Sequence, residues 1–326
     1  MCRRGQTSGM TLTAPQLDRA RGAVIASAVG DALGSQYEFG PPLSDATPVS
    51  YGVGVFGHGV GEWTDDTSMA MPILQALAAG ESLNDAHVLA QVVVAWREWA
   101  RDAKDVGAQT RTVLSALEGD VTEDRARSAA RDVHLRAGRS GGNGALMRTG
   151  PVALGYLADG QERDLVDAAT RIAQLTHWED DNADACVLWC LSIRHAILTG
   201  ELDVLGLLDV IPSGRRDRWR GFTEEALAPG AHPRDFSEQN GWVVRAFQGA
   251  LAAIAGATSA VDALERAVRG GNDTDTVAAI AGSLAGAVYG ADALPRALVA
   301  PVHGWPRLHV TDLIALSDSV VAKRGA

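Results

Sequence analysis

The strongest constraint on the fold of this chain is the spacing of its apolar residues, which recur every three or four positions along almost its whole length. The first such segment carries Leu17, Val24, Ile25, Ala28, Val29 and Leu33. This spacing is typical of an α-helix that buries one face, whereas a half-buried strand alternates apolar and polar residues. No segment shows a competing alternation. The sequence therefore predicts an all-α protein.

Start and stop signals divide this pattern into separate helices. Thr13-Ala14-Pro15 begins the first helix, which ends before the break at 34–42, and Gly80 ends the second. Ser82 is expected to cap the third helix, with Asp85 completing a capping box. Pro72 is expected to kink the second helix or delay its start. The predicted helices after the first span residues 65–79, 83–101, 107–117, 122–136, 145–158, 163–175, 182–199, 216–227, 241–256, 260–269, 275–289 and 311–323.

The composition favours one compact body of closely packed helices. Apolar residues make up 46% of the sequence, alanine is very frequent, and phenylalanine and tyrosine are scarce. No linker rich in Pro, Gly and Ser divides the chain, so we expect a flexible N-terminal extension at 1–14 and a single helical domain at 15–326. We expect a central buried helix where small residues recur, at Ala278, Gly282, Ala285 and Gly286.

Charge and segment composition exclude several classes of protein. The formal net charge of −11 is spread along the sequence, which argues against a protein that holds nucleic-acid phosphates. Polar residues follow the basic start, so no secretory signal is indicated, and no run approaches the roughly 20 apolar residues of a membrane helix. We expect a cytoplasmic monomer without membrane contact or stable nucleic-acid binding. Cys2, Cys186 and Cys190 form no CxxC pair and are interpreted as buried, unreactive thiols.

Two short acidic clusters carry the clearest functional signal. Thr64-Asp65-Asp66-Thr67 and Asp273-Thr274-Asp275-Thr276 each lead directly into an apolar helix. One such cluster alone would be interpreted as a helix cap, because threonine and aspartate accept hydrogen bonds from free amides and favour the positive end of the helix dipole. The presence of two similar clusters makes a shared site a second interpretation.

If the clusters converge, they bring four carboxylates into a small volume, and such a group repels itself unless cations are bound. Carboxylate and hydroxyl oxygens without histidine or cysteine among them select hard divalent ions such as Mg²⁺ or Mn²⁺. Two ions roughly 3.5–4 Å apart would polarise a substrate oxygen and position a water. The sequence alone does not establish that the clusters meet.

Two glycine-rich segments separate these helices. Residues 140–148 enter a predicted helix and form either an ordinary tight turn or a cradle whose amides bind a phosphate or diphosphate. Residues 43–63 predict an irregular surface loop. Its G-x-G-x-x-G pattern at 52–57 follows no long strand and enters no helix, so a dinucleotide-binding fold is rejected. The sequence contains no P-loop motif and no G-x-S-x-G elbow, so neither a P-loop nucleotidase nor a serine hydrolase is indicated.

Three further side chains admit both a structural and a functional interpretation. Glu38 lies on the turn after the first helix, where a solvated carboxylate is common. Asp105 occupies a position typical of a helix cap. His177 precedes an acidic stretch and is equally interpreted as a structural histidine, a ligand contact or a proton carrier.

Taken together and in order, these segments resemble the ADP-ribosylglycohydrolase family over about residues 16 to 290. The family fold implied by this resemblance is a compact all-α domain with a binuclear Mg²⁺ or Mn²⁺ centre. Many members run directly from Gly-Gly to Asp, where this chain inserts Asn272. The motifs that carry the resemblance are Gly30-Asp31-Ala32-Leu33-Gly34 with Glu38, Glu62-Trp63-Thr64-Asp65-Asp66-Thr67, Gly142-Asn143-Gly144-Ala145-Leu146-Met147-Arg148, Thr176-His177 and Gly270-Gly271-Asn272-Asp273-Thr274-Asp275-Thr276.

The resemblance also implies a role for each site residue. Glu38 would be a mobile acidic residue near the metals. Asp105 lies in a segment similar to the one that supplies an acidic catalytic residue in arginine-directed bacterial members. The cleft that binds ADP-ribose would be lined by Asn143, Gly144, Met147 and His177. The implied metal ligands are Thr64, Asp65, Asp66, Asp273, Asp275 and Thr276.

The activity implied is metal-dependent hydrolysis of the N- or O-glycosidic bond between ADP-ribose and a modified acceptor, with ADP-ribose as product. Asp105 favours ADP-ribosyl-arginine on a protein as the substrate. Asp105 or Glu38 would act as general base or stabilise the cationic sugar, and the sequence does not separate these roles. Alternatives are a hydrolase for serine-, nucleic-acid- or small-molecule-linked ADP-ribose, a catalytically silent ADP-ribose-binding module, and a purely structural helical protein.

Overall fold

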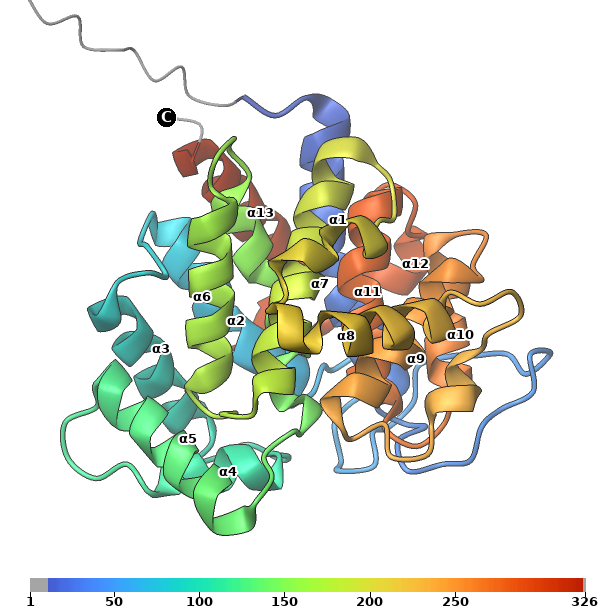
Figure 1. Cartoon of the computed structure of the whole chain (residues 1–326). Helices are drawn as coiled ribbons and strands as arrows, with labels where there is room; N and C mark the ends of the chain where they lie inside the picture. Colours follow the sequence, from blue (N-terminus) through green and yellow to red (C-terminus); the bar gives the residue numbers. More distant parts are fainter. Residues whose placement is uncertain (1–10, 325–326) are drawn as a thin grey trace, which may run out of the picture.

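Helices make up nearly all of the regular structure in residues 11–324, the part of the chain that the computed structural model describes (Figure 1). The all-α prediction is therefore confirmed. A short antiparallel hairpin pairs His303 with His309. The elements in chain order are α1 (Ala14–Gly34), α2 (Asp65–Ala79), α3 (Ala86–Trp99), α4 (Ala108–Ser115), α5 (Glu123–Ala137), η1 (Asn143–Ala145), η2 (Gly150–Tyr156), α6 (Glu162–Gln174), α7 (Asp180–Thr199), η3 (Leu205–Val210), α8 (Ser213–Ala226), η4 (Pro233–Phe236), α9 (Val243–Ala255), α10 (Ala260–Arg269), α11 (Thr274–Tyr289), α12 (Arg296–Val299), β1 (His303–Gly304), β2 (Leu308–His309) and α13 (Val310–Arg324).

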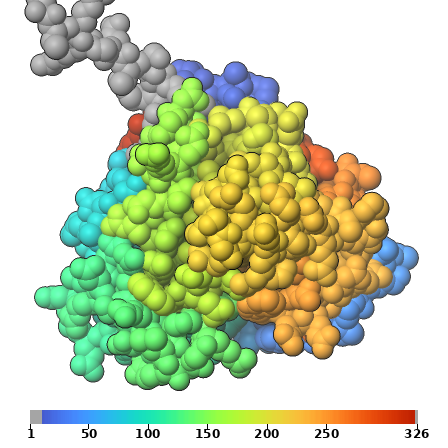
Figure 2. Space-filling model, viewed as in Figure 1, coloured from blue at the N-terminus to red at the C-terminus, as the bar shows by residue number. Residues whose placement is uncertain are grey.

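The helices α1 and α11 pack against each other at the centre of the fold (Figure 1). Glycines allow their backbones to touch: a Cβ atom at Gly286 would lie 2.0 Å from the carbonyl oxygen of Gly22, and one at Gly282 would lie 2.2 Å from that of Ala26. The predicted central helix of small residues is thus confirmed, with α1 as its partner. In Figure 2 the segments from α6 to α9 cover the face towards the viewer and hide most of this pair.

Buried side chains from the long helices form one continuous apolar core. Cys186 and Cys190 are fully buried within it as free thiols, as predicted. Cys2 and most of the predicted N-terminal extension lie outside the described residues. No helix in residues 11–324 is long and apolar enough to cross a membrane.

Several predicted helix boundaries are confirmed, and the differences have local causes. Thr13 caps α1 through a capping box with Gln16, and α2 ends at Gly80 with φ +88°. The prediction for Ser82 was wrong: Asp85 caps α3, because its carboxylate accepts a hydrogen bond from the amide of His87 at 2.7 Å.

The predicted helix at 145–158 was also wrong. The chain forms the short 3-10 helices η1 and η2 there, separated by residues 146–149. Gly150 and Pro151 begin η2, and neither residue favours a continuous α-helix, because glycine is flexible and proline lacks an amide hydrogen. The glycine-rich segment therefore enters a tight turn and not the N-terminus of a long helix.

Candidate metal and active site

The two acidic clusters meet where α2 and α11 begin, beside the C-terminal part of α1. The hydroxyl oxygen of Thr64 lies 2.7 Å from Oδ1 of Asp31, 3.1 Å from Oδ2 of Asp66 and 3.4 Å from Oδ2 of Asp275. Asp65 and Asp273 stand beside them, and all four cluster carboxylates interact electrostatically. The sequence predicted this convergence only as one of two possibilities, and the structure places the carboxylates together.

Neither of the residues at the N-cap positions, Thr64 and Asp273, caps its own helix through its side chain, although Oδ1 of Asp275 accepts a hydrogen bond from the amide of Thr276 at 2.9 Å. Asp31 from α1 caps α2 instead: its carboxylate accepts hydrogen bonds from the backbone amides of Thr64 and Thr67, each at 2.9 Å. This interaction fixes the start of α2 at Asp65, so Pro72 does not delay the helix. Asp31 belongs to a motif of the sequence but was not predicted as a site residue. Its signal was a carboxylate within an otherwise apolar helical segment.

The arrangement of the carboxylates fits hard divalent cations. Asp31, Asp66 and Asp275 offer oxygens within 4.8 Å of one another, and so do Glu38, Asp273 and Asp275. Oδ1 of Asp66 is buried and has no hydrogen-bond partner among the described residues. Burial and the neighbouring carboxylates raise the pKa of Asp66 and of Asp275 well above the ordinary value. Bound cations would stabilise such a buried group of acids, because they offset the electrostatic repulsion between the ionised carboxylates.

The cluster opens into a cleft of about 350 Å³, and every predicted substrate-binding residue lines it. Asn143 donates a hydrogen bond to Oδ2 of Asp273 at 2.7 Å, which joins the cleft to the acidic cluster. Gln109 and Gly241 also line the cleft but were not predicted, since neither stands in a motif of the sequence. The predicted residues in its wall are Glu38, Asp65, Asp105, Asn143, Gly144, Met147, His177, Asp273, Asp275 and Thr276.

His177 is a buried, neutral histidine at the base of this cleft. Burial and then the nearby Arg148 guanidinium lower its pKa well below the ordinary value. The hydroxyl oxygen of Thr176 accepts a hydrogen bond from Arg148 at 2.6 Å and lies 2.7 Å from Nδ1 of His177. The other ring nitrogen, Nε2, faces the glycines of the cleft wall, where a Cβ at Gly142 would lie 3.3 Å from it. A Cβ at Gly144 would lie 3.2 Å from that nitrogen, so the glycine gives the imidazole room.

Glu38 occupies a turn that is held by the Gly-Gly-Asn segment before α11. The amide of Phe39 donates to the carbonyl of Asn272 at 2.7 Å, and the amide of Asn272 donates to the carbonyl of Gly40 at 2.8 Å. Gly271 and Asn272 both have positive φ, at +85° and +58°, which glycine and asparagine tolerate. Asn272 therefore ties the turn carrying Glu38 to the helix carrying the second acidic cluster.

Burial of the acidic cluster predicts how the stability of the metal-free protein depends on pH. Burial, followed by neighbouring carboxylates, raises the pKa of Asp65 and that of Glu38 to about 8. The folded state then holds protons that the unfolded state has released, so stability falls as pH rises towards 8. The lowered pKa values of His58, His177 and His232 act in the opposite direction, because the unfolded state binds their protons, but this effect ends near the lower limit of the range. Between pH 6.5 and 8.5 we therefore expect the Tm in chelator to fall by about 5 °C.

The measurement is a thermal melt in EDTA and in Mg²⁺ or Mn²⁺ across that pH range. Bound cations favour the ionised carboxylates, so the metal-loaded protein should lose less stability with pH. Asp65→Asn serves as the control, since it removes one of the carboxylates whose pKa is raised and should flatten the slope in chelator. A Tm in chelator that stays constant or rises over this range would contradict the prediction.

The fold and the cluster together define an all-helical protein whose buried carboxylates can hold divalent cations next to a ligand-sized cleft. The sequence profile of the ADP-ribosylglycohydrolase family matches residues 12–326, and the chain belongs to this family. A solved structure, "ADP-ribosylglycohydrolase-related protein complex", superposes with a TM-score of 0.71 at 27% identity, covering 96% of this chain and 100% of that one.

Curated relatives agree with this assignment. The ADP-ribosylarginine hydrolase Tri1 of Pseudomonas putida (strain GB-1) is 30% identical, over 89% of this chain and 76% of its own. The ADP-ribosyl-[dinitrogen reductase] glycohydrolase of Rhodospirillum rubrum is 29% identical, over 87% of this chain and 90% of its own. The human ADP-ribosylhydrolase ARH3 is 26% identical, over 93% of each chain.

Proposed function

We propose that this protein is a metal-dependent hydrolase that removes ADP-ribose from arginine side chains of modified proteins. The observation that carries the proposal is the junction of the buried acidic cluster with the cleft, through the hydrogen bond between Asn143 and Asp273. Two of the bacterial relatives cited above are named for ADP-ribosylarginine or for ADP-ribosylated dinitrogen reductase. The first name supports arginine as the acceptor, and the second supports a modified protein as the substrate.

The proposed cofactors are two divalent ions, Mg²⁺ or Mn²⁺. The two overlapping carboxylate groups share Asp275, which suits neighbouring ions. Asp31 accepts three hydrogen bonds from Thr64 and Thr67, so we assign it a positioning role for α2. When bound, such ions would supply Lewis-acid stabilisation of charge at the substrate. The proposed ligands are Thr64, Asp65, Asp66, Asp273, Asp275 and Thr276.

The protein side chains would bind and orient the ADP-ribose in the cleft. His177 presents a neutral imidazole that is suited to a hydrogen bond with a hydroxyl group of the ligand, and Met147 and the glycine at 144 shape the wall. Excluding bulk water from the narrow cleft strengthens each polar contact within it.

In the proposed reaction, a water oxygen forms a bond to the anomeric carbon of the ribose while the bond from that carbon to the acceptor nitrogen breaks. One water proton passes to a carboxylate, and the departing guanidine nitrogen takes up a proton, so the products are ADP-ribose and arginine. Asp105 and Glu38 both face the cleft and are suited to move this proton. Burial, followed by Asp273, raises the pKa of both groups, which brings a carboxylate closer to the pKa that proton transfer at neutral pH requires.

A panel of linkages tests this proposal. The purified protein with Mg²⁺ or Mn²⁺ is incubated with ADP-ribose linked to arginine, serine, DNA and acetate, and the released ADP-ribose is quantified by chromatography. We expect arginine-linked substrate to be cleaved at least about 10-fold faster than the others, which corresponds to about 1.4 kcal/mol in the transition state.

The other outcomes of the panel separate the alternatives. Fastest cleavage of a serine, DNA or acetyl linkage would retain the enzyme class but reject the arginine acceptor. Calorimetric binding of ADP-ribose without release from any substrate would indicate a silent binding module. Failure to bind either Mn²⁺ or ADP-ribose would leave a purely structural protein. We also propose that the protein is a monomer and that it is cytoplasmic. Sedimentation tests the oligomeric state, and cell fractionation tests the location.

A further inference from the structure

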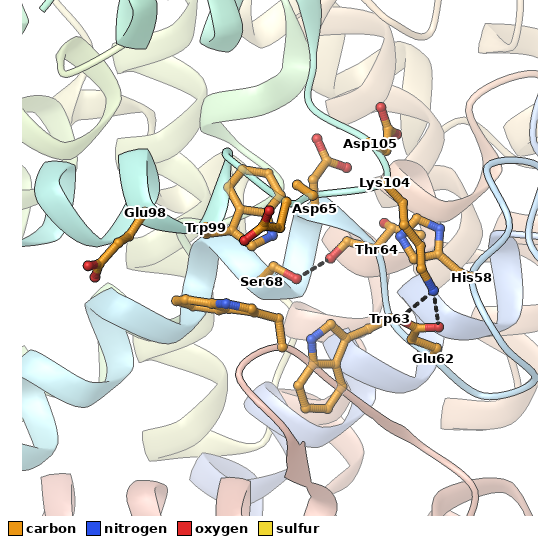
Figure 3. Close-up of a pocket in the computed structure, with 13 residues that line it drawn as sticks. His58, Glu62, Trp63, Thr64, Asp65, Ser68, Glu98, Trp99, Lys104 and Asp105 are labelled. Atoms are coloured by element: carbon orange, nitrogen blue, oxygen red, sulfur yellow. Dashed lines mark hydrogen bonds and ion pairs between the residues drawn. The ribbon is translucent and has the colours of Figure 1, made fainter.

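A second cavity, of about 210 Å³, lies on the opposite side of two acidic residues from the cleft. Asp65 and Asp105 line both spaces, and the residues assigned to ADP-ribose line only the first. Figure 3 shows these two carboxylates at one edge of the second cavity, with Trp63 and Trp99 among its walls. The second cavity therefore borders the same two carboxylates as the cleft.

The charge of this cavity selects for a cation. Besides Asp65 and Asp105, which it shares with the cleft, three carboxylate side chains and one ammonium line it. The ammonium of Lys104 is held by both oxygens of Glu62, at 2.9 and 2.7 Å, and the pair is visible in Figure 3. Glu98 and Asp102 are exposed, and neither forms an ion pair with any described residue. An incoming cation thus meets carboxylates that no lysine or arginine of residues 11–324 neutralises.

The walls of the cavity favour a flat cation. Trp63 and Trp99 are buried, and Trp305, which lies between β1 and β2, joins them from the far end of the chain. A guanidinium stacks on indole faces and forms paired hydrogen bonds with carboxylates, whereas an ammonium is compact and more strongly hydrated. An uncharged serine hydroxyl would gain little from these surroundings.

Two side chains that line the cavity each carry a buried nitrogen without a hydrogen-bond partner among the described residues. The two nitrogens are Nε1 of Trp63 and Nδ1 of His58. Trp63 is 1% exposed and His58 is 6% exposed. Buried polar atoms are rarely left without a partner, because desolvation without a hydrogen bond is costly.

We propose that this second cavity is the acceptor subsite, which binds the guanidinium of the modified arginine against the partly exposed indole of Trp305 and the carboxylate of Asp102. The proposal rests on the proposed hydrolase function and adds the residues that recognise the acceptor. Asp102 and Trp305 are specificity-determining residues in this assignment and take no part in the metal cluster.

The test uses the full-length, Mn²⁺-loaded protein and agmatine, a free guanidinium compound, as the probe. Calorimetry measures agmatine binding with ADP-ribose present, and ADP-ribose binding alone. We expect Asp102→Lys and Trp305→Ala to weaken agmatine binding, and to raise the KM for ADP-ribosyl-arginine, by at least about 10-fold. ADP-ribose affinity should stay within about 2-fold. Asp120→Lys, an exposed residue outside both cavities, is the matched control and should change neither.

Each outcome decides the proposal. If the wild-type protein binds ADP-ribose and cleaves the arginine linkage but Asp102→Lys retains the wild-type KM and agmatine affinity, the subsite assignment is wrong and the proposed function stands. If the wild-type protein neither binds ADP-ribose nor cleaves any linkage, the proposed function fails and the subsite fails with it. Should Trp305→Ala not fold, the exposed Asp102 variant still gives the answer.

Discussion

Replacing Asp66 or Asp273 with asparagine is expected to lower kcat/KM for ADP-ribosyl-arginine by more than about 1,000-fold, or about 4 kcal/mol, and to weaken Mn²⁺ binding at the same time. Asp66 is buried with one carboxylate oxygen that no described residue satisfies. Asp273 accepts a hydrogen bond from Asn143. Loss of either carboxylate therefore removes a charge that the proposed cations need, in a site where water does not replace it.

The measurements are steady-state kinetics and a Mn²⁺ titration on each variant, together with a thermal melt in chelator. Because asparagine removes one of several repelling charges, the metal-free variants should be at least as stable as the wild-type protein. Asp120→Asn, at an exposed loop position, controls for the loss of one negative charge and should retain full activity. Full hydrolysis by a chelator-treated Asp66→Asn/Asp273→Asn double variant would show that the metal interpretation is wrong.

Gly286→Ala is expected to destabilise the protein by about 3 kcal/mol or more, although it adds a single methyl group. The new Cβ would lie 2.0 Å from the carbonyl oxygen of Gly22, a backbone atom that cannot rotate away. The central helices α1 and α11 would have to separate, which disturbs the packing on both sides of the pair. Since α1 carries Asp31 and α11 carries Asp275, the separation should also weaken Mn²⁺ binding.

Urea unfolding and a Mn²⁺ titration test this expectation. Gly221→Ala is the matched control: it makes the same substitution within α8, where a Cβ would meet nothing within 4 Å. Alanine has the higher helix propensity, so this control should be neutral or gain about 0.5–1 kcal/mol. Equal stability of the two variants would contradict the close packing of α1 on α11.

The sequence by itself determined the elements of the fold and the chemical character of the site. Apolar spacing placed most helices to within a few residues, because a helix that buries one face records that face in its own sequence. The small residues of α11 predicted a close helix contact. The acid-rich starts of α2 and α11 predicted hard-cation chemistry, since the type of donor atom is a property of the residues themselves.

Tertiary structure decided which of these features act together. The distance between Asp66 and Asp275 depends on how α1, α2 and α11 pack, and no local pattern encodes it. Asp31 was missed for the same reason. Its carboxylate accepts hydrogen bonds from backbone amides at the start of a helix that begins more than 30 positions later in the chain. The prediction of a helix at 145–158 failed at Gly150 and Pro151, where the chain forms a short 3-10 helix. Trp305 joins residues near 100 only through the folded chain. A helical pattern depends on residues that are neighbours in the sequence. A site depends on the distances between residues far apart in the sequence, and the packing of the whole core sets those distances.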